Sequence, residues 1–430
     1  MYPALGGTYY QDRNDGLLVS QGVKNLVKEN RLSHSGEQRE SGKQQVIDTI
    51  RAAGSIARID ISTATRVSPA TVTAITAELI DVGLIEEIIP DVPRQEAKRG
   101  RPRVALKIRG DAHRIAGIKV SHRVISVVLL DFEGNDIVDH EMPLQQACMP
   151  VSQLCTSIMD ALAQACSKGG FDISTISGIG VGLAGLVDAK RNFVYWSSSL
   201  DERNVDFGAH LAQHTPCPIF IDNDANLVAK AEHLFGKGQN VSDFVVITIE
   251  HGVGMGIVIN NEIYRGSRGC GAEFGHTKVQ LEGALCQCGQ RGCLEAYVGD
   301  YALLREANIT NGGVGHRDLG QLVEAAQSGD QMACSIFDRA GRMFAMGLAN
   351  VVNVFDPKLI ILSGARLSFD YLYSEQVIQE MQRWVVQVDA PPPEVLVHSW
   401  GDLMWAKGAA AYAIEEVSAL AIRELASSEK

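Results

Sequence analysis

Residues 271–295 read GAEFGHTKVQLEGALCQCGQRGCLE and bring one imidazole and three thiols into a short stretch of chain. These groups belong to His276, Cys286, Cys288 and Cys293. Three thiolates and one imidazole are a recognised tetrahedral zinc set that leaves no ligand position open. The stretch therefore predicts a structural zinc loop. The Cys-x-Cys spacing is tighter than the common Cys-x2-Cys, and three buried thiols beside a core histidine are the alternative.

Carboxylates lie on both sides of this cluster. Glu273 stands three residues before His276, and Glu295 follows Cys293 by two residues. A small zinc loop can hold such groups rigidly towards a polar ligand that carries many hydroxyls. Asn223 and Asp224 directly follow a short apolar strand, a place where side chains point into a crevice. Asp224 can accept a proton from a ligand hydroxyl there, or it can simply cap the next helix.

The run from Glu273 to His276, followed by Cys286 to Glu295, resembles the signature of the ROK family of sugar kinases and sugar-responsive repressors. The resemblance covers roughly residues 43–425. It implies a two-lobed actin-like (ribonuclease H-like) ATPase fold. It also implies a set of sugar-binding residues, namely Gly185, Asn223, Asp224, Glu273, His276 and Glu295. Family members often have Asn where this chain has Ser199, which leaves the identity of the sugar open.

Residues 43–110 carry the pattern of a winged helix-turn-helix. Ser68 is a good N-cap and Pro69 a good first residue for a third short helix, and two strands follow with a basic hairpin between them. The predicted DNA contacts are small polar residues of the helix and cations of the hairpin, namely Ser68, Ala70, Thr71, Thr73, Lys98, Arg99, Arg101 and Arg103. The alternative is a helical dimerisation module with a solvated hairpin. Gly100 to Pro102 also resembles the repressor branch of the ROK family.

The distribution of charge agrees with a DNA-binding module on an acidic body. The net charge is −12, yet residues 1–110 carry 16 Lys and Arg against 13 Asp and Glu, whereas residues 111–430 carry 23 against 38. No apolar run reaches the roughly 20 residues that a membrane helix needs. Nine cysteines, three of them assigned to a metal, predict a reducing cytoplasm and no disulfide framework.

Two rounds of strands followed by helices predict an α/β body with two similar lobes. The expected domains are an N-terminal extension (1–42), a winged helix-turn-helix (43–110), a first lobe (111–235) and a second lobe (236–430) that contains the zinc loop 271–295. For the C-terminal helix, packing against the first lobe is an open alternative to packing within the second lobe.

The phosphate-binding loops of ROK kinases have no counterpart in this sequence. Where the kinases read Asp-x-Gly-Gly-Thr, residues 119–123 read KVSHR, and where they read Gly-Thr-Gly, residues 250–252 read EHG. Near the adenosine site, Ser363-Gly364 replaces Gly-Gly. The expected function is therefore a sugar-controlled transcriptional repressor without enzyme activity, and the alternative is a ROK sugar kinase with an accessory domain. Expected partners are operator DNA, a small sugar effector and further copies of the chain in a homodimer or dimer of dimers. A regulatory protein is an additional candidate partner, and no membrane insertion is expected.

Overall fold

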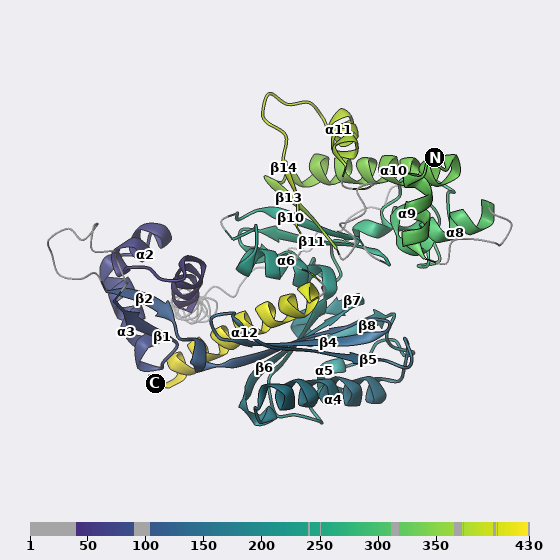
Figure 1. Cartoon of the computed structure of the whole chain (residues 1–430). Coiled ribbons are helices and arrows are strands. Elements are labelled where there is room, and N and C mark those ends of the chain that lie inside the picture. Colours follow the sequence, from purple (N-terminus) through teal and green to yellow (C-terminus); the bar gives the residue numbers. More distant parts are fainter. Residues whose placement is uncertain are drawn as a thin grey trace, which may run out of the picture.

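The computed structural model describes residues 40–89, 104–239, 241–249, 251–310, 318–364, 372, 374–398, 401 and 403–428. Figure 1 shows three bodies in this chain: an N-terminal module, a lower lobe and an upper lobe. Most of the N-terminal extension and four of the predicted DNA contacts, Lys98, Arg99, Arg101 and Arg103, lie outside the described residues. Within the described part, no helix is long and apolar enough to cross a bilayer.

The N-terminal module is a winged helix-turn-helix, as the sequence predicts. A helix over residues 40–53 precedes α2 (Arg58–Thr65) and α3 (Pro69–Asp81), and β1 (Ile85–Ile88) then pairs antiparallel with β2 (Ala105–Ile108). The hydroxyl of Ser68 accepts a hydrogen bond from the Thr71 N–H at 3.2 Å, and Pro69 is the first helical residue. The cap and the proline thus start α3 where the sequence places its start.

Each lobe contains a five-stranded sheet with the same topology, in which three antiparallel strands are followed by two parallel ones. The first sheet has the order β5-β4-β3-β6-β9, from β3 (Arg114–Val120), β4 (Val124–Asp131), β5 (Asp136–Pro143), β6 (Ile176–Leu183) and β9 (Ile219–Asn223). The second has the order β12-β11-β10-β13-β14, from β10 (Phe244–Ile249), β11 (Val253–Ile259), β12 (Glu262–Ile263), β13 (Leu359–Ser363) and β14 (Glu394–Val397). This duplication is the two-lobed actin-like fold.

One expected strand is divided in two. From the sequence, residues 179–187 are expected to form a buried strand that ends in a Gly-rich turn at Ala184-Gly185. In the structure β6 ends at Leu183, and a separate hairpin of β7 (Gly185–Asp188) and β8 (Phe193–Ser197) begins two residues later. The break lies at Gly185, whose φ of +140° is open to glycine and whose missing side chain leaves room for the Trp196 carbonyl. The turn carries the Gly185 carbonyl towards the end of β9.

Helices cover both faces of the two sheets. In the first lobe these are α4 (Val151–Gly169) and α5 (Phe207–Leu211), and in the second lobe α7 (Glu295–Val298), α8 (Asp300–Thr310), α9 (Leu319–Gln327), α10 (Gln331–Phe355) and α11 (Glu375–Trp384). Two further helices, α6 (Asp224–Phe235) and α12 (Met404–Ser428), pack against each other and lie between the two sheets (Figure 1). They form the joint between the lobes.

α12 crosses the first sheet at very short range. Two glycines on the facing strands make this possible, because a Cβ built on Gly117 of β3 would lie 2.0 Å from the Ala406 carbonyl oxygen, and one on Gly180 of β6 would lie 1.9 Å from that of Ala409. Neighbouring residues of β3, such as Ala116 and Ile118, point to the opposite face and pack with α4. The C-terminal helix therefore packs on the sheet of the first lobe, although the chain reaches it from the second.

The winged module shares its hydrophobic core with the body. Val46, Ile50 and Leu79 of the module belong to one buried cluster with Leu130 of β4 and Ile414 of α12. A cluster that runs through three elements of this kind holds the module against the body by packing rather than by a tether. A shift of α12 would therefore change the contacts that hold the module against the body.

The close approach of α12 predicts a sharp sensitivity at Gly180. We expect Gly180→Ala to lower the free energy of unfolding by about 1–3 kcal/mol, because the new methyl group meets a backbone carbonyl that cannot move alone. Gly42→Ala is the control, since it lies in a helix and its Cβ meets only Ile75 at 3.8 Å; it should be neutral or stabilising by about 0.5–1 kcal/mol. Equal thermal and urea stability of wild type and Gly180→Ala would contradict the packing.

Candidate functional site

The carboxyl end of β9 carries the first group of site residues. Asn223 is the N-cap of α6: its side-chain oxygen accepts a hydrogen bond from the Ala225 N–H at 2.9 Å, and its Nδ2 donates to the Gly185 carbonyl at 2.7 Å. Asp224 is thus the first residue of the helix and not its cap. Three predicted residues, Gly185, Asn223 and Asp224, therefore come together through strand and helix ends.

Asp224 is paired with a lysine of the central strand. Lys119 Nζ lies 2.6 Å from Asp224 Oδ2, and the lysine side chain is buried, with 10% of it exposed. The sequence assigns Lys119 to the position of the first phosphate loop of the kinases. The structure directs its ammonium to the carboxylate of Asp224, so each of the two charges has a partner of opposite sign.

A second buried charge pair supports the same strand end. Asp222 is 1% exposed and accepts from Arg265 at 2.9 Å (Nε) and 2.7 Å (Nη2). Its other oxygen accepts from the Asn226 amide at 3.0 Å. A buried carboxylate with these partners is fully satisfied, so Asp222 fixes the backbone beneath Asn223. The Asp-Asn-Asp run hints at this residue, but nothing in the sequence points to Arg265.

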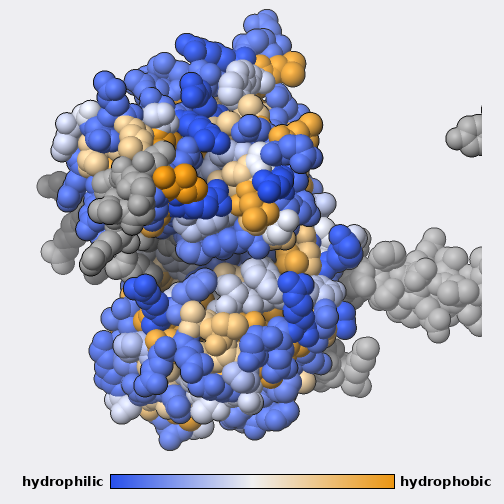
Figure 2. All heavy atoms as spheres, turned by 90° about the vertical axis from the view of Figure 1, so that its right-hand side faces the viewer, coloured by the Kyte–Doolittle hydropathy of each residue, from blue (hydrophilic) through white to orange (hydrophobic). Residues whose placement is uncertain are grey.

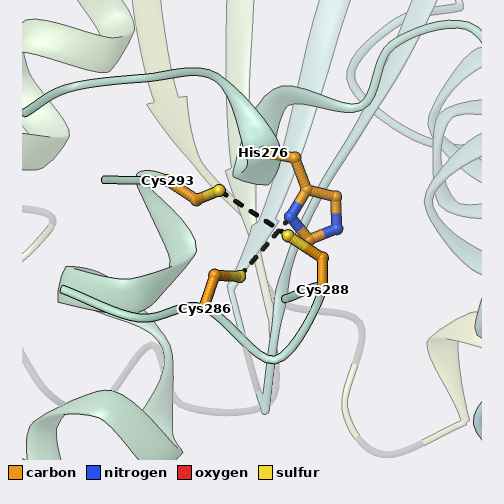
Figure 3. A group of neighbouring side chains, drawn as sticks. All are labelled: His276, Cys286, Cys288 and Cys293. Atoms are coloured by element: carbon orange, nitrogen blue, oxygen red, sulfur yellow. Dashed lines mark hydrogen bonds between the residues drawn. The ribbon is translucent and has the colours of Figure 1, made fainter. Parts of the chain in front are cut away.

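The predicted metal ligands meet in the second lobe. One ligand atom from each of His276, Cys286, Cys288 and Cys293 lies within 4.8 Å of all the others (Figure 3). The His276 Nδ1 to Cys286 Sγ distance is 3.7 Å, and so is the Cys288 Sγ to Cys293 Sγ distance. Metal–sulfur bonds of about 2.3 Å in a tetrahedron place neighbouring sulfurs roughly 3.8 Å apart. The four groups have the spacing of a tetrahedral metal site.

The chemistry of these thiols also fits a cation. Burial raises the pKa of the Cys293 thiol to about 11, so a thiolate at this position needs a positive charge beside it. Lys278 Nζ lies 3.1 Å from the same sulfur, which is a partial compensation. A metal ion bound by the four groups would supply the rest and hold the thiolates ionised.

Glu295 links the Cys3His group to the second sheet. Its side chain is buried; one oxygen accepts from the Val253 N–H at 3.2 Å, and the other lies 3.3 Å from the Tyr301 hydroxyl and 3.5 Å from Cys286 Sγ. Glu295 is therefore held by the second sheet, by α8 and by a metal ligand at once. Its position depends on the fold of the loop.

Glu273 completes the group from the start of the 3-10 helix Phe274–His276. Desolvation by the surrounding protein raises the pKa of Glu273 to about 7; the charge of His276 opposes this, and the charges of Asp224 and Glu295 add to it. Glu273 is nevertheless exposed at the surface. The charges of Glu273, Asp224, Glu295 and His276 thus lie close enough to interact across the two lobes. Figure 2 shows the two lobes as separate bodies, with the molecule narrower between them.

Two histidines lie in the turns that the sequence assigns to the positions of the two phosphate loops. The ring of His122, between β3 and β4, is 5.2 Å from the ring of His251, which begins the turn before β11, and His251 is 5.6 Å from the ring of Tyr301. Burial, followed by the charges of His251 and Lys119, lowers the pKa of His122. Glu250, expected to repel a polyphosphate here, lies outside the described residues.

The predicted DNA contacts within the described residues share one side of α3. Ser68, Ala70, Thr71 and Thr73 are all exposed, whereas Val72, Ile75 and Leu79 of the same helix are buried. The first turn of α3 carries no acidic residue, so its positive dipole end is free for a phosphate. The helix is exposed on the face that the sequence assigns to bases.

A winged helix-turn-helix joined to a two-lobed actin-like body, with a Cys3His group in the second lobe, defines a class of sugar-related regulators and kinases. The ROK family profile matches residues 115–416. The chain belongs to the ROK family.

Curated relatives of this chain are transcriptional repressors. The xylose repressor of Caldicellulosiruptor bescii is 28% identical over 346 residues, which is 78% of this chain and 86% of that protein. The DNA-binding transcriptional repressor Mlc of Escherichia coli is 27% identical over 351 residues, covering 80% of this chain and 85% of that protein. Both alignments extend beyond the part of the chain that the family profile matches.

Solved structures agree with the division into module and body. A ROK family transcriptional regulator, described as a homologue of E. coli Mlc, superposes with a TM-score of 0.74 at 26% identity over 89% of this chain and 98% of that one. A ROK family glucokinase from Streptomyces griseus, solved with glucose and AMPPNP, has a TM-score of 0.61 at 29% identity and covers 70% of this chain and 99% of its own. The regulator thus matches a larger share of this chain than the kinase does.

The cluster of Figure 3 predicts about one metal ion per chain in the purified protein. We expect Cys288→Ser to remove most of this metal and to lower the melting temperature, because one thiolate of the tetrahedron is lost. Cys148→Ser, at an exposed free cysteine outside the cluster, should keep both. Elemental analysis by mass spectrometry measures the content; wild-type protein purified without chelator and free of metal would contradict the site.

Proposed function

We propose that this protein is a DNA-binding transcriptional repressor of sugar-metabolism genes, controlled by a sugar bound between the lobes of its ROK body. The observation that carries the proposal is the shared core of the winged module, β4 and α12, which ties a DNA-binding element to a body with the residues of a sugar site. The curated relatives named above are repressors, which supports the same reading. The ligand set for the sugar is Gly185, Asn223, Asp224, Glu273, His276 and Glu295.

Zinc is the metal that we propose for the Cys3His group. Soft thiolates and an imidazole at tetrahedral spacing favour zinc over the hard cations, which take oxygen ligands. All four ligand positions are filled by protein, so the ion would be structural. When bound, it would fix the loop on which Glu273, His276 and Glu295 stand, and these residues would then face the sugar hydroxyls.

In this proposal His276 is both a metal ligand and a sugar ligand. Its Nδ1 faces the sulfur of Cys286, while the second ring nitrogen points away from the cluster (Figure 3). A metal on Nδ1 fixes the tautomer, so the other nitrogen carries its hydrogen and can donate to a sugar oxygen. Glu273 and Glu295 then provide acceptors for sugar hydroxyls on either side.

The kinase alternative is disfavoured by the surroundings of Asp224. A general base must be free to take a proton from a sugar hydroxyl, and a nucleotide needs a tight loop of small residues for its phosphates. Lys119 occupies Asp224 at 2.6 Å, and the imidazoles of His122 and His251 stand in the two turns that would face the phosphates. The protein is therefore proposed to bind its sugar without phosphorylating it, and Asp224 is a sugar ligand rather than a catalyst.

The remaining partners follow from this function. Operator DNA is expected to be pseudo-palindromic and bound by a homodimer or a dimer of dimers, because a single winged module reads only one half-site. A regulatory protein is a further possible partner. None of the nine cysteines, all of which lie within the described residues, forms a disulfide. A reducing cytoplasm is the location that we propose.

Ala70 tests the DNA interface. We expect Ala70→Glu to weaken binding to duplexes selected by the wild type at least about tenfold, because it places a negative charge at the exposed N-terminal turn of α3, against phosphates. Ala163→Glu makes the same change on an exposed position of α4 in the first lobe and should bind normally. Fluorescence anisotropy at several salt concentrations measures both; equal affinities for the two variants would place the interface elsewhere.

Asp224 tests the sugar site and the absence of catalysis. We expect one of D-xylose, D-glucose or N-acetyl-D-glucosamine to bind, Asp224→Asn to weaken that binding by about tenfold or more through loss of a charge-assisted hydrogen bond, and DNA binding to persist. Asp139→Asn, at an exposed aspartate of β5, is the control. Calorimetry measures binding and a coupled assay measures ADP release with each sugar. Phosphorylation above background would restore the kinase alternative.

A further inference from the structure

Lys119 carries a buried charge whose partners lie on two different elements. Its side chain extends from β3, and its ammonium meets Asp224 at the first turn of α6, at 2.6 Å. On another side, the same nitrogen lies 5.7 Å from the ring centroid of Trp405, which belongs to the first turn of α12. Taking an ammonium out of water is costly unless it is paired, so this nitrogen stays with Asp224 as long as the carboxylate is free to hold it.

Trp405 lies in the joint between the lobes. It is buried and belongs to a core cluster with Val228 of α6 and with Phe244 and Val246 of β10, in the second sheet. A cation within about 6 Å of an indole ring is attracted to its face. The lysine therefore connects the proposed sugar ligand Asp224 to a residue of the core that α6 and α12 share with the second sheet.

From Trp405 the chain continues directly into the helix that reaches the winged module. The next residue, Ala406, and later Ala410 and Ile414 belong to the cluster shared with the module. The close approach of α12 to Gly117 and Gly180 leaves the helix little freedom to bend, so a displacement at its first turn is passed along its length. Lys119 stands at the end of α12 that lies nearest the sugar residues.

We propose that Lys119 is a positioning residue and the sensor of the sugar site: it orients Asp224 for a sugar hydroxyl and passes the occupancy of Asp224 through Trp405 to α12 and the winged module. A hydroxyl that donates to Asp224 takes up part of the negative charge that holds the ammonium. The ammonium then moves relative to the indole ring, and the first turn of α12 follows. The inference rests on the proposed sugar site and names the regulation of that site.

The connection can be tested without knowing the sugar. In protein labelled with 5-fluorotryptophan, Trp405→Phe assigns the Trp405 fluorine resonance. We expect Asp224→Asn to shift this resonance in the presence of Lys119 and to shift it far less in the Lys119→Met background. Lys168→Met removes a lysine from an exposed ion pair with Asp139 and should leave the resonance in place. An Asp224→Asn shift of equal size in both backgrounds overturns the proposal.

The regulatory consequence is tested with ligands. For whichever of D-xylose, D-glucose and N-acetyl-D-glucosamine binds the wild type, we expect Lys119→Met to weaken binding by about tenfold or more and Lys119→Arg to recover part of the loss, as the loss of a charge-assisted contact implies. The ratio of sugar affinities with and without selected operator DNA should move towards one in Lys119→Met.

The two experiments distinguish a failure of the proposed sugar site from a failure of the proposed role of Lys119. If none of the three sugars binds the wild type, the proposed function loses its support, while the fluorine resonance of Trp405 still decides the role of Lys119. If a sugar binds, and Lys119→Met keeps both its affinity within about twofold and its dependence on DNA, the lysine neither positions Asp224 nor reports on it. A change in circular dichroism would identify a variant that has merely unfolded.

Discussion

The packing of α12 across the first sheet is the constraint on which the rest of the molecule depends. The helix lies so close to β3 and β6 that two backbone carbonyls occupy the space where side chains of residues 117 and 180 would stand. On its other sides it packs with α6 and with the helices of the winged module. Because one helix packs against all of these parts, the winged module, the joint between the lobes and the proposed sugar residues at the start of α6 are physically connected.

Charge compensation distinguishes the proposed sugar site from the site of a kinase with the same fold. A kinase must leave its base free and must surround polyphosphate with backbone N–H groups. Here the carboxylate of Asp224 is held by Lys119, and the ring of His122 lies 5.2 Å from that of His251. In the repressor that we propose, Glu273, His276 and Glu295 bind the sugar from one loop, and this needs none of the phosphate-binding groups.

Local sequence was sufficient wherever one short stretch determines its own structure. Ser68 and Pro69 define the start of α3 because a cap and a proline act within one turn. The cysteine spacing in residues 286–293 brings the ligands together because glycines fold the loop within a few residues. The strands of the two five-stranded sheets were predicted from their apolar runs, whereas β8 was not predicted and the break at Gly185 was predicted only as a turn.

Contacts between residues far apart in the chain could not be predicted from the sequence, and these contacts determine the electrostatics of the candidate site. The Lys119–Asp224 pair joins residues 105 positions apart, and the sequence assigned the lysine to a lost phosphate loop instead. Arg265 pairs with Asp222, which lies 43 positions away in the chain, and no sequence motif indicates this contact. Such pairs form because the fold brings two strand ends together and a buried charge must then find a partner. A family signature thus proposes the candidate residues, whereas only tertiary packing shows which partner each carboxylate has.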